Sequence, residues 1–369
     1  MNPATTRAPA TRTRSLLVVE QGFLKPRKGK VVHGVELFRL HLMRQLIDRG
    51  VQVTVVAERS WRATIEAALG AGRASLVLAP PVAGVPGAGM IGVTRARRAR
   101  REGFDTVLFG NARLGLVPAM HYAAWTEMGR RLLLFAHRDP GANFLDAVGT
   151  VSFDTVANSE WVASWYRGQT SGRVGVFYGL ANADRFYPSP DRAGRADTLV
   201  HFVLLGRLPN ISKGVEKAIA ALNMLPDEVR ARCRLHLASY RDPPDFGDPC
   251  IVGHRWMDAD RVPQFLRTMD AMLAVSTHET FSQAIVQGML TGLPIVSSAI
   301  PVYVEKIDPE AGGAGGVITR STAEVARAME ALALDADLRR RLGEEGRRVA
   351  LERFVWDTDR FVREHLFPE

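Results

Sequence analysis

The stretch DAMLAVSTHETFSQAIVQGMLTGLPIVSS occupies residues 270–298 and predicts a strand, a tight turn, a helix and a second strand. Residues 271–275 form a continuous apolar run, which is typical of a strand buried on both faces of a parallel sheet. Thr280, with Gln283 three residues later, is a capping-box pattern that predicts a helix start. The Gly-Leu-Pro sequence at 292–294 ends that helix before the next strand. The stretch therefore predicts one repeat of a parallel α/β fold.

The front of this predicted helix is a candidate binding site. The amides of Phe281, Ser282 and Gln283 would lack intrahelical partners and would carry the positive end of the helix dipole, about half a charge. Such an end binds phosphate. Glu279 lies just outside it as an acceptor for hydroxyl groups, and Gln287 shares a helix face with Gln283. This combination suits a sugar nucleotide, although an ordinary strand–helix–strand unit with a capped helix is the alternative.

The pattern Glu279-x7-Gln287 resembles the E-x7-E signature of the family-four retaining glycosyltransferases, which have the GT-B fold. The resemblance implies that Glu279 contacts hydroxyl groups of the donor sugar and that position 287 contacts the nucleotide ribose. This chain has Gln287 in place of the second glutamate, and Ser282 stands where the family commonly has a glycine. An amide still hydrogen-bonds ribose hydroxyls, but it brings no charge.

Length and composition limit the classes of protein to which the chain could belong. A chain of 369 residues with 46% hydrophobic residues suits two α/β domains. Its apolar runs are far shorter than the roughly 20 residues of a membrane-spanning helix. Residues 1–14 have no apolar core, which favours a disordered tail over a signal peptide. Cys233 and Cys250 lack metal-ligand spacing and fit a reducing compartment, so we expect a cytoplasmic protein.

The positive charge is concentrated in the N-terminal half. Residues 1–190 hold 25 Lys and Arg against 13 Asp and Glu, whereas the remainder holds 23 against 26. The densest cluster consists of Arg95, Arg97, Arg98, Arg100 and Arg101. A solvated helix face is one interpretation of this cluster. An anionic partner, such as a lipid surface, a phosphorylated glycan or a nucleic acid, is the more specific one.

The first domain is predicted to begin like a Rossmann-like fold. An apolar strand at 15–20 leads into a basic loop, a helix opened by His33 and Gly34, and a second strand at 51–56. The loop lacks the G-x-G-x-x-G dinucleotide fingerprint. The family resemblance places Gly34 near the donor phosphates and the acceptor, and this chain has His33 where the family has a first glycine.

His137 follows the predicted strand 132–135, outside the carboxyl end of that strand, where open α/β sheets bind ligands. A packed loop residue is the alternative. The family commonly has a histidine here in contact with the donor sugar, and the resemblance implies the same role for His137. Arg138 and Asp139 are weaker candidates.

The second domain begins with the apolar strand 199–205 and continues as Gly206-Arg207-Leu208, with Lys213-Gly214 downstream. This segment resembles the family motif whose Arg and Lys hold the donor diphosphate. Two cations on a strand-to-helix loop suit two phosphates, because charge-assisted hydrogen bonds contribute about 1.5–3 kcal/mol each. The resemblance also places the nucleotide base near Gly253 and His254.

The sequence thus predicts an α/β protein of the GT-B fold, with two Rossmann-like domains facing a central cleft. The expected divisions are a disordered tail at 1–14, an acceptor-binding domain at 15–187, a linker at 188–198, a nucleotide-sugar-binding domain at 199–350 and, at 351–369, a C-terminal helix that crosses back to the first domain. The resemblance runs from about residue 15 to the end and is strongest over 199–356.

The predicted function is that of a retaining glycosyltransferase that moves a hexose-type sugar from a UDP- or GDP-sugar to an acceptor hydroxyl. Cations and amides at the diphosphate would stabilise the charge that grows on the leaving group. The candidate catalytic residues are His137, Glu279, Arg207 and Lys213. The candidate donor-binding residues are Gly34, Arg207, Lys213, Gly253, His254, Glu279, Thr280, Phe281, Ser282, Gln283 and Gln287.

Partners and alternatives complete the prediction. We expect no required cofactor, and the sequence neither implies nor excludes a divalent metal. The acceptor would be an anionic glycan, lipid or modified nucleic acid at the basic N-terminal half, and the protein could contact the inner membrane face peripherally. A sugar-nucleotide epimerase or a phosphorylase on the same fold, and a basic nucleic-acid-binding protein, are the alternatives.

Overall fold

The computed structural model describes residues 13–26, 34–80, 88–110, 114–178, 181–189, 199–208, 211–240, 242–308 and 315–368. The chain divides into two compact units. Unit 1 takes Met1–Asn158, Val162–Phe177 and Asp357–Glu369, and unit 2 takes Ser159–Trp161 and Tyr178–Trp356. The last segment of the chain therefore belongs to the first unit. His33, most of the predicted tail and most of the predicted linker lie outside the described residues.

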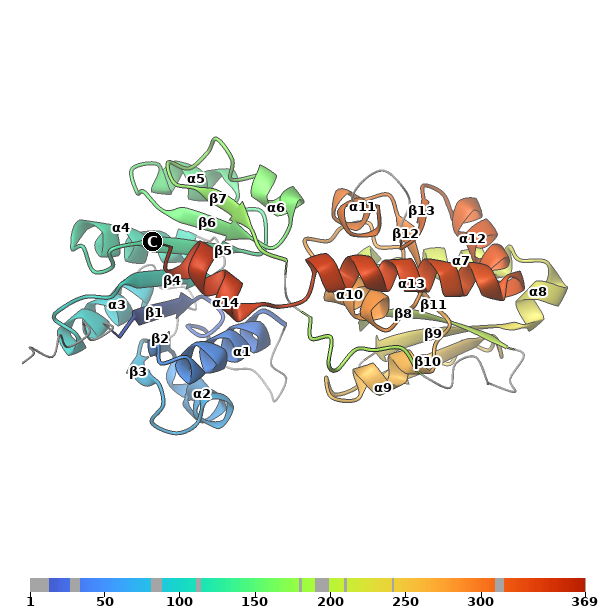
Figure 1. The fold of residues 1–369 in the computed structure, drawn as a ribbon, viewed down its shortest axis with the longest axis horizontal. Helices are drawn as coiled ribbons and strands as arrows, with labels where there is room; N and C mark the ends of the chain where they lie inside the picture. Colours follow the sequence, from blue (N-terminus) through green and yellow to red (C-terminus); the bar gives the residue numbers. More distant parts are fainter. Residues whose placement is uncertain are drawn as a thin grey trace, which may run out of the picture. The chain divides into compact units, whose positions relative to one another are not determined.

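Unit 1 contains a seven-stranded sheet in the order β3-β2-β1-β4-β5-β6-β7, and every neighbouring pair is parallel (Figure 1). Its strands are β1 Ser15–Glu20, β2 Gln52–Ala57, β3 Ser75–Leu78, β4 Thr106–Gly110, β5 Leu132–Ala136, β6 Asp154–Ala157 and β7 Val174–Val176. The order reverses between β1 and β4. This reversal is the switch point at which open α/β sheets bind ligands, outside the carboxyl ends of the strands.

The helices of the first half of the chain connect these strands as right-handed crossovers require. They are α1 Gly34–Asp48, α2 Arg62–Leu69, α3 Ala88–Ala99, α4 Val117–Trp125, α5 Ala142–Val148 and α6 Glu160–Ser164, with short 3-10 turns at η1 Arg59–Trp61 and η2 Leu114–Leu116. The C-terminal pieces α14 Thr358–Phe361 and η5 Val362–Leu366 complete the unit. They are held there by bonds such as that from the Thr106 hydroxyl to the carbonyl of Leu366, 2.8 Å long.

Unit 2 repeats the arrangement with six parallel strands in the order β10-β9-β8-β11-β12-β13. Its strands are β8 Val200–Leu208, β9 Cys233–Tyr240, β10 Ile251–Arg255, β11 Ala271–Ala274, β12 Ile295–Ser298 and β13 Gly316–Thr319. Its helices are α7 Val215–Asn223, α8 Asp227–Ala231, α9 Val262–Arg267, α10 Gln283–Leu290, α11 Pro301–Ile307, α12 Thr322–Leu334 and α13 Ala336–Arg353, with a 3-10 turn η4 at Ile211–Lys213. The switch point of this sheet lies between β8 and β11.

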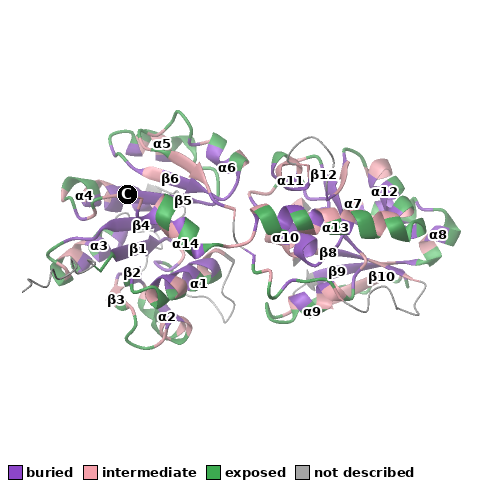
Figure 2. Ribbon diagram, in the orientation of Figure 1, coloured by how far each residue is buried: buried purple, intermediate pink, exposed green. Residues whose placement is uncertain are grey.

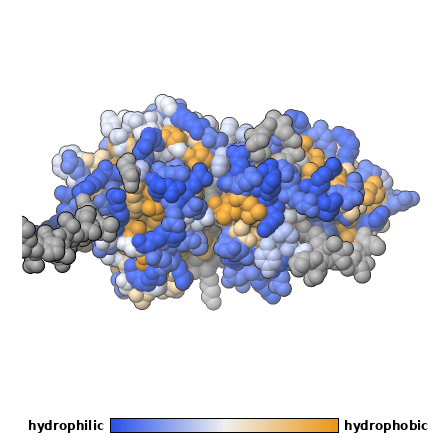
Figure 3. Space-filling view, viewed as in Figure 1, coloured by the Kyte–Doolittle hydropathy of each residue, from blue (hydrophilic) through white to orange (hydrophobic). Residues whose placement is uncertain are grey.

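Both sheets are buried on their two faces, as the continuous apolar strand sequences predict. In unit 2 one apolar cluster joins the sheet to α7, α8 and α12, and a second joins it to α9, α10 and α11. Figure 2 shows the central strands buried, the edge strands partly buried and the outward helix faces exposed. The outward face of α13 carries exposed charged pairs such as Arg348 with Glu345, and this surface is hydrophilic in Figure 3.

The predicted strands of both domains are confirmed, but one predicted helix differs from the structure. In the C-terminal part of unit 2, α12 and α13 are separate helices, because Asp335 leaves helical geometry and its side chain accepts a hydrogen bond from the amide of Leu338 to begin α13. The helix expected from Thr280 begins later, at Gln283. Among the described helices, none is both long enough and apolar enough to cross a membrane.

Candidate active site

The loops after β8 and β11 meet at the switch point of unit 2. The amide of Thr277 donates to the carbonyl of Ser212 at 2.9 Å. Gly214, which begins α7, has φ 73°, and a Cβ there would overlap the carbonyl oxygen of Val275. Only glycine satisfies both the left-handed backbone and this close approach. Gly214 therefore lets the loop after β8 pack closely against the loop after β11.

Lys213 and Glu279, which are 66 residues apart in sequence, form an ion pair across these loops. Their side chains are 23% and 15% exposed. The stem of Lys213 passes over Gly206, where a Cβ would lie 3.2 Å from the Lys213 Cδ atom. Two residues predicted independently as donor ligands are thus brought into contact, and each neutralises the other. Arg207 belongs to β8, but its side chain lies outside the described part of the chain.

A small cavity opens beside this ion pair. It is lined by residues from the ends of β8 and β11 and from α11, including Leu205, Lys213, Ser276, Glu279, Ser282 and Tyr303. The Tyr303 hydroxyl is hydrogen-bonded to the side chains of Ser276 and Ser282, and burial raises the pKa of Tyr303 far above its ordinary value. A neutral phenol and two serine hydroxyls therefore line the same cavity as the charged pair.

The start of α10 corrects the prediction of a capping box at Thr280. Ser282 occupies the N-cap position with φ 61°, in the left-handed region, and its side chain makes no capping bond. The Thr280 carbonyl accepts a hydrogen bond from the Ser159 hydroxyl at 2.8 Å instead of entering the helix. The first-turn amides are therefore those from Gln283 onward. The left-handed conformation explains why the family that the chain resembles commonly has a glycine at this position, because glycine adopts it without steric cost.

Phe281 is a core residue rather than part of the helix front. Its side chain is 4% exposed, and its ring lies 4.2 Å from the ammonium of Lys306, a cation–π contact. Lys306 is fully buried on α11 and donates to the carbonyl of Val302 at 3.4 Å. Burial lowers the pKa of Lys306 to about 7, and the negative charges of Glu305 and Glu279 oppose this shift. No sequence pattern predicts this buried lysine, because its contact with Phe281 comes from another element.

Lys306 should make stability depend on pH. Between pH 7 and its ordinary pKa of 10.5, the unfolded chain holds a proton that the folded chain has released, so the free energy of unfolding rises with pH over that window. Below pH 7 both states are protonated and the full cost of burying the charge applies. Lys306→Met should therefore raise the free energy of unfolding most at pH 6 and flatten its rise between pH 7 and 10.

Urea unfolding at pH 6, 7, 8 and 9 measures this effect. Lys217→Met, at a half-buried lysine of α7 that reaches the hydroxyl of Ser298 at 3.5 Å, is the matched control and should leave the slope unchanged. A Lys306→Met variant with the wild-type slope would show that burial does not shift this lysine.

The remaining donor candidates of unit 2 lie on α10 and β10. Gln287 is half-buried on α10, one turn behind Gln283, which fits the spacing argument. Gly253 and His254 belong to β10. A Cβ at Gly253 would lie 2.7 Å from the Cβ of Pro243, so this glycine has a packing role. Contacts of these residues with a donor stay predictions.

Unit 1 has its own polar cluster at the carboxyl end of the sheet. Glu20 ends β1, and its carboxylate pairs with Arg39 of α1 at 3.1 Å, with both side chains fully buried. Gly110 ends β4, and a Cβ there would overlap the Glu20 carboxylate. Gly34, another predicted site residue, is the first residue of α1. The neighbouring strand ends are therefore occupied by a buried ion pair that the sequence analysis did not identify.

Arg39 links this ion pair to His137. Its Nη2 atom donates to the carbonyl of Phe135 at 3.4 Å and lies 3.3 Å from the His137 Nε2 atom. An arginine can only donate, so Nε2 accepts and a neutral ring carries its proton on Nδ1. Burial, together with the positive charges of Arg39 and Arg138, holds the pKa of His137 well below its ordinary value, which keeps the ring neutral.

The other ring nitrogen of His137 faces Asn158. The separation from Nδ1 to the Asn158 amide nitrogen is 3.5 Å, while the buried Asn158 oxygen has no hydrogen-bond partner. Rotating the Asn158 amide by half a turn exchanges its oxygen and nitrogen. The oxygen then accepts the proton of His137 Nδ1, which satisfies both groups. Both nitrogens of His137 are then held by protein groups. Its predicted contact with a donor sugar stays a prediction.

No group of three or more His, Cys, Asp or Glu side chains in the described ranges is arranged to hold a metal ion. The two cysteines, Cys233 and Cys250, are free thiols in the core of unit 2, and burial raises the pKa of Cys233 to about 11. Protein side chains in the described regions thus offer cations, hydroxyls, amides and carboxylates to a ligand, in the places where a Rossmann-like sheet binds one.

Comparison with known proteins agrees with this arrangement. Residues 200–335 match the family described as Glycosyl transferases group 1, and this segment contains Lys213, Glu279 and the switch point of unit 2. A search of curated proteins with the sequence gave no match.

Solved structures share the fold over almost the whole chain. A glycosyltransferase from Rickettsia africae superposes with a TM-score of 0.74 at 15% identity, over 97% of this chain and 97% of that one. Sucrose-phosphate synthase from Thermosynechococcus elongatus gives 0.72 at 15% identity, over 94% and 96%. HepE of Anabaena, solved in complex with UDP and glucose, gives 0.66 at 18% identity, over 93% and 96%. The fold is GT-B, as predicted.

Proposed function

We propose that the chain is a glycosyltransferase that takes its sugar from a nucleotide donor, and that unit 2 binds this donor through Lys213 and Glu279. The match of residues 200–335 to the group 1 family and the GT-B fold support this proposal. The observation that carries the proposal is the Lys213–Glu279 ion pair at the switch point between β8 and β11. Lys213 would bind the diphosphate, and Glu279 would accept hydrogen bonds from hydroxyl groups of the sugar. The diphosphate and the sugar hydroxyls would then replace the ion pair.

The chemistry follows from the charge that develops in the reaction. When the bond between the sugar and the diphosphate breaks, its electron pair stays on the phosphate oxygen, and the leaving group becomes more negative. Lys213, the side chain of Arg207 and the amides at the start of α10 would stabilise that charge more than the ground state, which lowers the barrier. We propose transfer with retention of the anomeric configuration, a hexose-type sugar, and a UDP- or GDP-linked donor. The mechanism proposed here requires no metal.

The basic cluster of unit 1 lies away from His137. Arg100 donates to the side-chain oxygen of Gln52, the first residue of β2, at 2.8 Å, so this end of the cluster lies where strands begin, whereas His137 follows a strand end. Arg95, at the other end of the cluster, donates to the carbonyl of Leu78, the last residue of β3. Arg97 donates to the carbonyl of Thr126 at 2.8 Å, beside Trp125, which is 83% exposed. We define the basic edge as Arg95, Arg97, Arg98, Arg100, Arg101 and Trp125.

We propose that the basic edge contacts an anionic surface that carries the acceptor, such as a lipid headgroup layer at the inner membrane face. Arg95, Arg98 and Arg101 are exposed, whereas Arg97 and Arg100 are half-buried. Exposed arginines attract anionic headgroups, and an exposed tryptophan suits the interface between water and lipid. The acceptor would then be a hydroxyl of an anionic lipid or lipid-linked glycan. Free glycans and modified nucleic acids, the other predicted acceptors, would reach the protein without such a surface.

A transfer assay tests the function and the acceptor together. The protein is incubated with UDP- and GDP-hexoses and with lipid acceptors in anionic or zwitterionic vesicles, and the anomeric configuration of the product is read by NMR. We expect an α-linked product from an α-linked donor, with faster transfer on anionic vesicles. At 1 M salt, where screening acts beyond about 3 Å, this preference should disappear.

Matched variants separate the two parts of the proposal. Arg98→Gln/Arg101→Gln should abolish the preference for anionic vesicles, whereas Arg340→Gln/Arg348→Gln on exposed α13 should not. A β-linked product would contradict retention. Equal rates on both kinds of vesicle would contradict a role for the basic edge.

A further inference from the structure

The loop between β11 and α10 is joined at its two ends by the hydroxyl of Tyr303. Tyr303 lies on α11 and is 1% exposed, and its hydroxyl is hydrogen-bonded to the side chains of Ser276 and Ser282. Ser276 lies just after β11, and Ser282 is the N-cap of α10. A phenol hydroxyl donates one hydrogen bond and accepts others, so this single group serves both serines. The helix α11 therefore fixes the two ends of the loop relative to each other.

Ser282 has a backbone conformation that its own side chain disfavours. Its φ is 61°, and Glu127 is the other non-glycine residue of the described ranges with a positive φ. In the left-handed region the Cβ atom crowds the following carbonyl oxygen. The Ser282 side chain makes no capping hydrogen bond that could offset this cost, and its hydroxyl is bonded to Tyr303 instead. Strained residues of this kind persist where the surrounding structure holds them, and they cluster at functional sites.

The two residues before Ser282 have contacts of their own. The Thr280 carbonyl accepts a hydrogen bond from the Ser159 hydroxyl at 2.8 Å, and the Phe281 ring lies 4.2 Å from the ammonium of Lys306. Neither contact involves the hydroxyl of Ser282, so both would remain if its hydrogen bond were lost. The tyrosine hydroxyl therefore acts on the backbone at one position, the one from which α10 begins.

Position 282 decides where the amides at the start of α10 point. The proposed donor site uses these amides, from Gln283 onward, together with Lys213 to bind the diphosphate. Ser282 and Tyr303 line the same cavity as Lys213. The family that the chain resembles commonly has a glycine at position 282, and glycine adopts the left-handed region without steric cost. The serine of this chain needs a partner to stay there.

We propose that Tyr303 is a positioning residue of the donor site. Its hydroxyl holds Ser282 in the left-handed conformation that glycine would adopt unaided, and this keeps the amides at the start of α10 directed at the donor diphosphate. Tyr303 acts through Ser282. The inference rests on the proposed donor site of unit 2 and adds a residue, outside the motifs of that site, on which its geometry depends.

Two single variants remove the hydrogen bond from either side. Tyr303→Phe keeps the ring in the apolar cluster of α9, α10 and α11 but leaves Ser282 without its partner, and Ser282→Ala removes the serine hydroxyl but keeps the Cβ atom. Inorganic pyrophosphate is the probe, because it carries two phosphates and no base. We expect calorimetric titration to give each variant about tenfold weaker affinity for pyrophosphate than wild type, because the binding-competent conformation falls to about a tenth of the population.

Glycine at position 282 provides the rescue. Ser282→Gly should bind pyrophosphate within about twofold of wild type, and adding Tyr303→Phe to it should weaken binding by no more than about another twofold. The tyrosine hydroxyl should therefore matter only when residue 282 has a side chain. A tenfold loss from Tyr303→Phe in both backgrounds would overturn the inference, and so would wild-type affinity in Tyr303→Phe alone.

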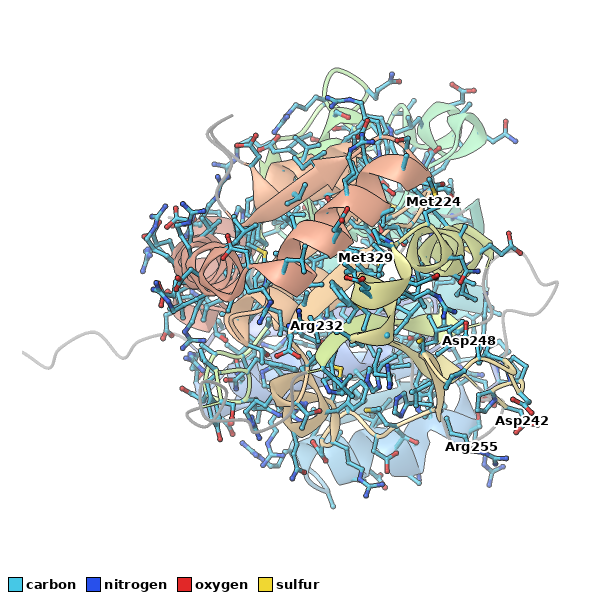
Figure 4. The ribbon with its side chains drawn as sticks, turned by 90° about the vertical axis from the view of Figure 1, so that its right-hand side faces the viewer. Met224, Arg232, Asp242, Asp248, Arg255 and Met329 are labelled. Atoms are coloured by element: carbon cyan, nitrogen blue, oxygen red, sulfur yellow. The ribbon has the colours of Figure 1, made fainter. Side chains whose placement is uncertain are left out.

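A core variant of unit 2 controls for lost stability. Met329 of α12, labelled in Figure 4, is fully buried in the apolar cluster that joins the sheet to α7, α8 and α12. Alternate residues of β11 enter this cluster and the cluster of Tyr303, so the two lie on opposite faces of the sheet. Met329→Ala should lower the urea midpoint of unfolding at least as much as Tyr303→Phe and leave the affinity for pyrophosphate unchanged. An equal loss of affinity in Met329→Ala would show that Tyr303→Phe acts through stability, which would overturn the inference.

Crystal structures of Tyr303→Phe and of Tyr303→Phe/Ser282→Gly test the inference without a ligand. We expect residue 282 to leave the left-handed region in the single variant and to keep it in the double variant. An unchanged φ at Ser282 in Tyr303→Phe would overturn the inference even if the donor site is correct. If the folded wild-type protein bound neither pyrophosphate nor a nucleoside diphosphate, the donor site itself would be contradicted, and the positioning role would fall with it.

Discussion

Lys213→Ala should weaken binding of the donor nucleotide at least tenfold and lower the rate of transfer by about 10²- to 10³-fold. The larger effect on rate is expected because Lys213 would meet the charge that grows on the leaving diphosphate, and groups of this kind act more strongly on the transition state than on the ground state. The lysine is held for this role by Gly206 beneath its stem and by the fixed loop at Gly214. Steady-state kinetics with the preferred sugar nucleotide measure both effects.

The partner of Lys213 provides the control. Lys213→Ala also leaves Glu279 without its ion-pair partner, so the double variant Lys213→Ala/Glu279→Gln is compared with both single variants. Glu279→Gln should weaken recognition of the sugar but leave pyrophosphate binding intact, whereas Lys213→Ala should weaken both. The double variant should not recover activity. If Lys213→Ala kept wild-type kinetics, the diphosphate would have to bind elsewhere.

Arg39→Met should lower the free energy of unfolding of unit 1 by about 3–5 kcal/mol, because it leaves the carboxylate of Glu20 buried without its cation. Glu20→Gln should be similarly costly, since it leaves the guanidinium buried and unpaired. The double variant Arg39→Met/Glu20→Gln should recover most of the loss, because no uncompensated charge remains. Urea unfolding followed by fluorescence and circular dichroism measures these differences.

The exposed ion pairs of α13 are the matched control. Arg348→Ala removes an arginine that pairs with Glu345 at 2.6 Å and Glu352 at 2.7 Å, with its side chain 54% exposed. It should change stability by no more than about 1 kcal/mol, as surface pairs do. If Arg39→Met cost as little as Arg348→Ala, the buried pair would not anchor α1 to the sheet.

Arg39 should also affect the chemistry through His137. The arginine fixes His137 Nε2 as an acceptor, so its removal frees the ring to take either tautomer. His137, which was predicted from its place after β5, is thus part of a hydrogen-bond network with Arg39 and Asn158. The sequence placed His137 correctly at the end of a strand, but nothing in the spacing of Arg39, 98 residues away, indicates that the two side chains meet.

The architecture was predictable because parallel strands buried on both faces have a strong signature. Apolar runs such as 15–20, 132–135 and 271–275 coincide with β1, β5 and β11, and the turns between them are marked by glycine. Lys213 and Glu279 were predicted as members of one site from their resemblance to two family motifs, and the structure shows that both residues follow strands that flank the switch point of unit 2.

Other parts of the site could not be read from sequence. The predicted start of α10 was wrong because Thr280 and Gln283 have the spacing of a capping box, while in the structure Ser282 is left-handed and the Thr280 carbonyl accepts a hydrogen bond from the Ser159 hydroxyl. Lys306 has the sequence of an ordinary helix lysine, and only the packing of α11 against Phe281 buries it. The contacts of His236 with His201 and with His254 depend on the register of β8, β9 and β10, which a one-residue slip in any of these strands would destroy.

Calorimetric titration of the wild-type protein with UDP, GDP and ADP, repeated on Lys213→Ala, tests the role of Lys213 most directly. We expect wild type to bind one of these nucleotides and the variant to bind it at least tenfold more weakly. That result would place the donor diphosphate at Lys213 and would identify the base. If the folded wild-type protein bound none of the three nucleotides, the assignment of unit 2 as the donor-binding unit would be contradicted.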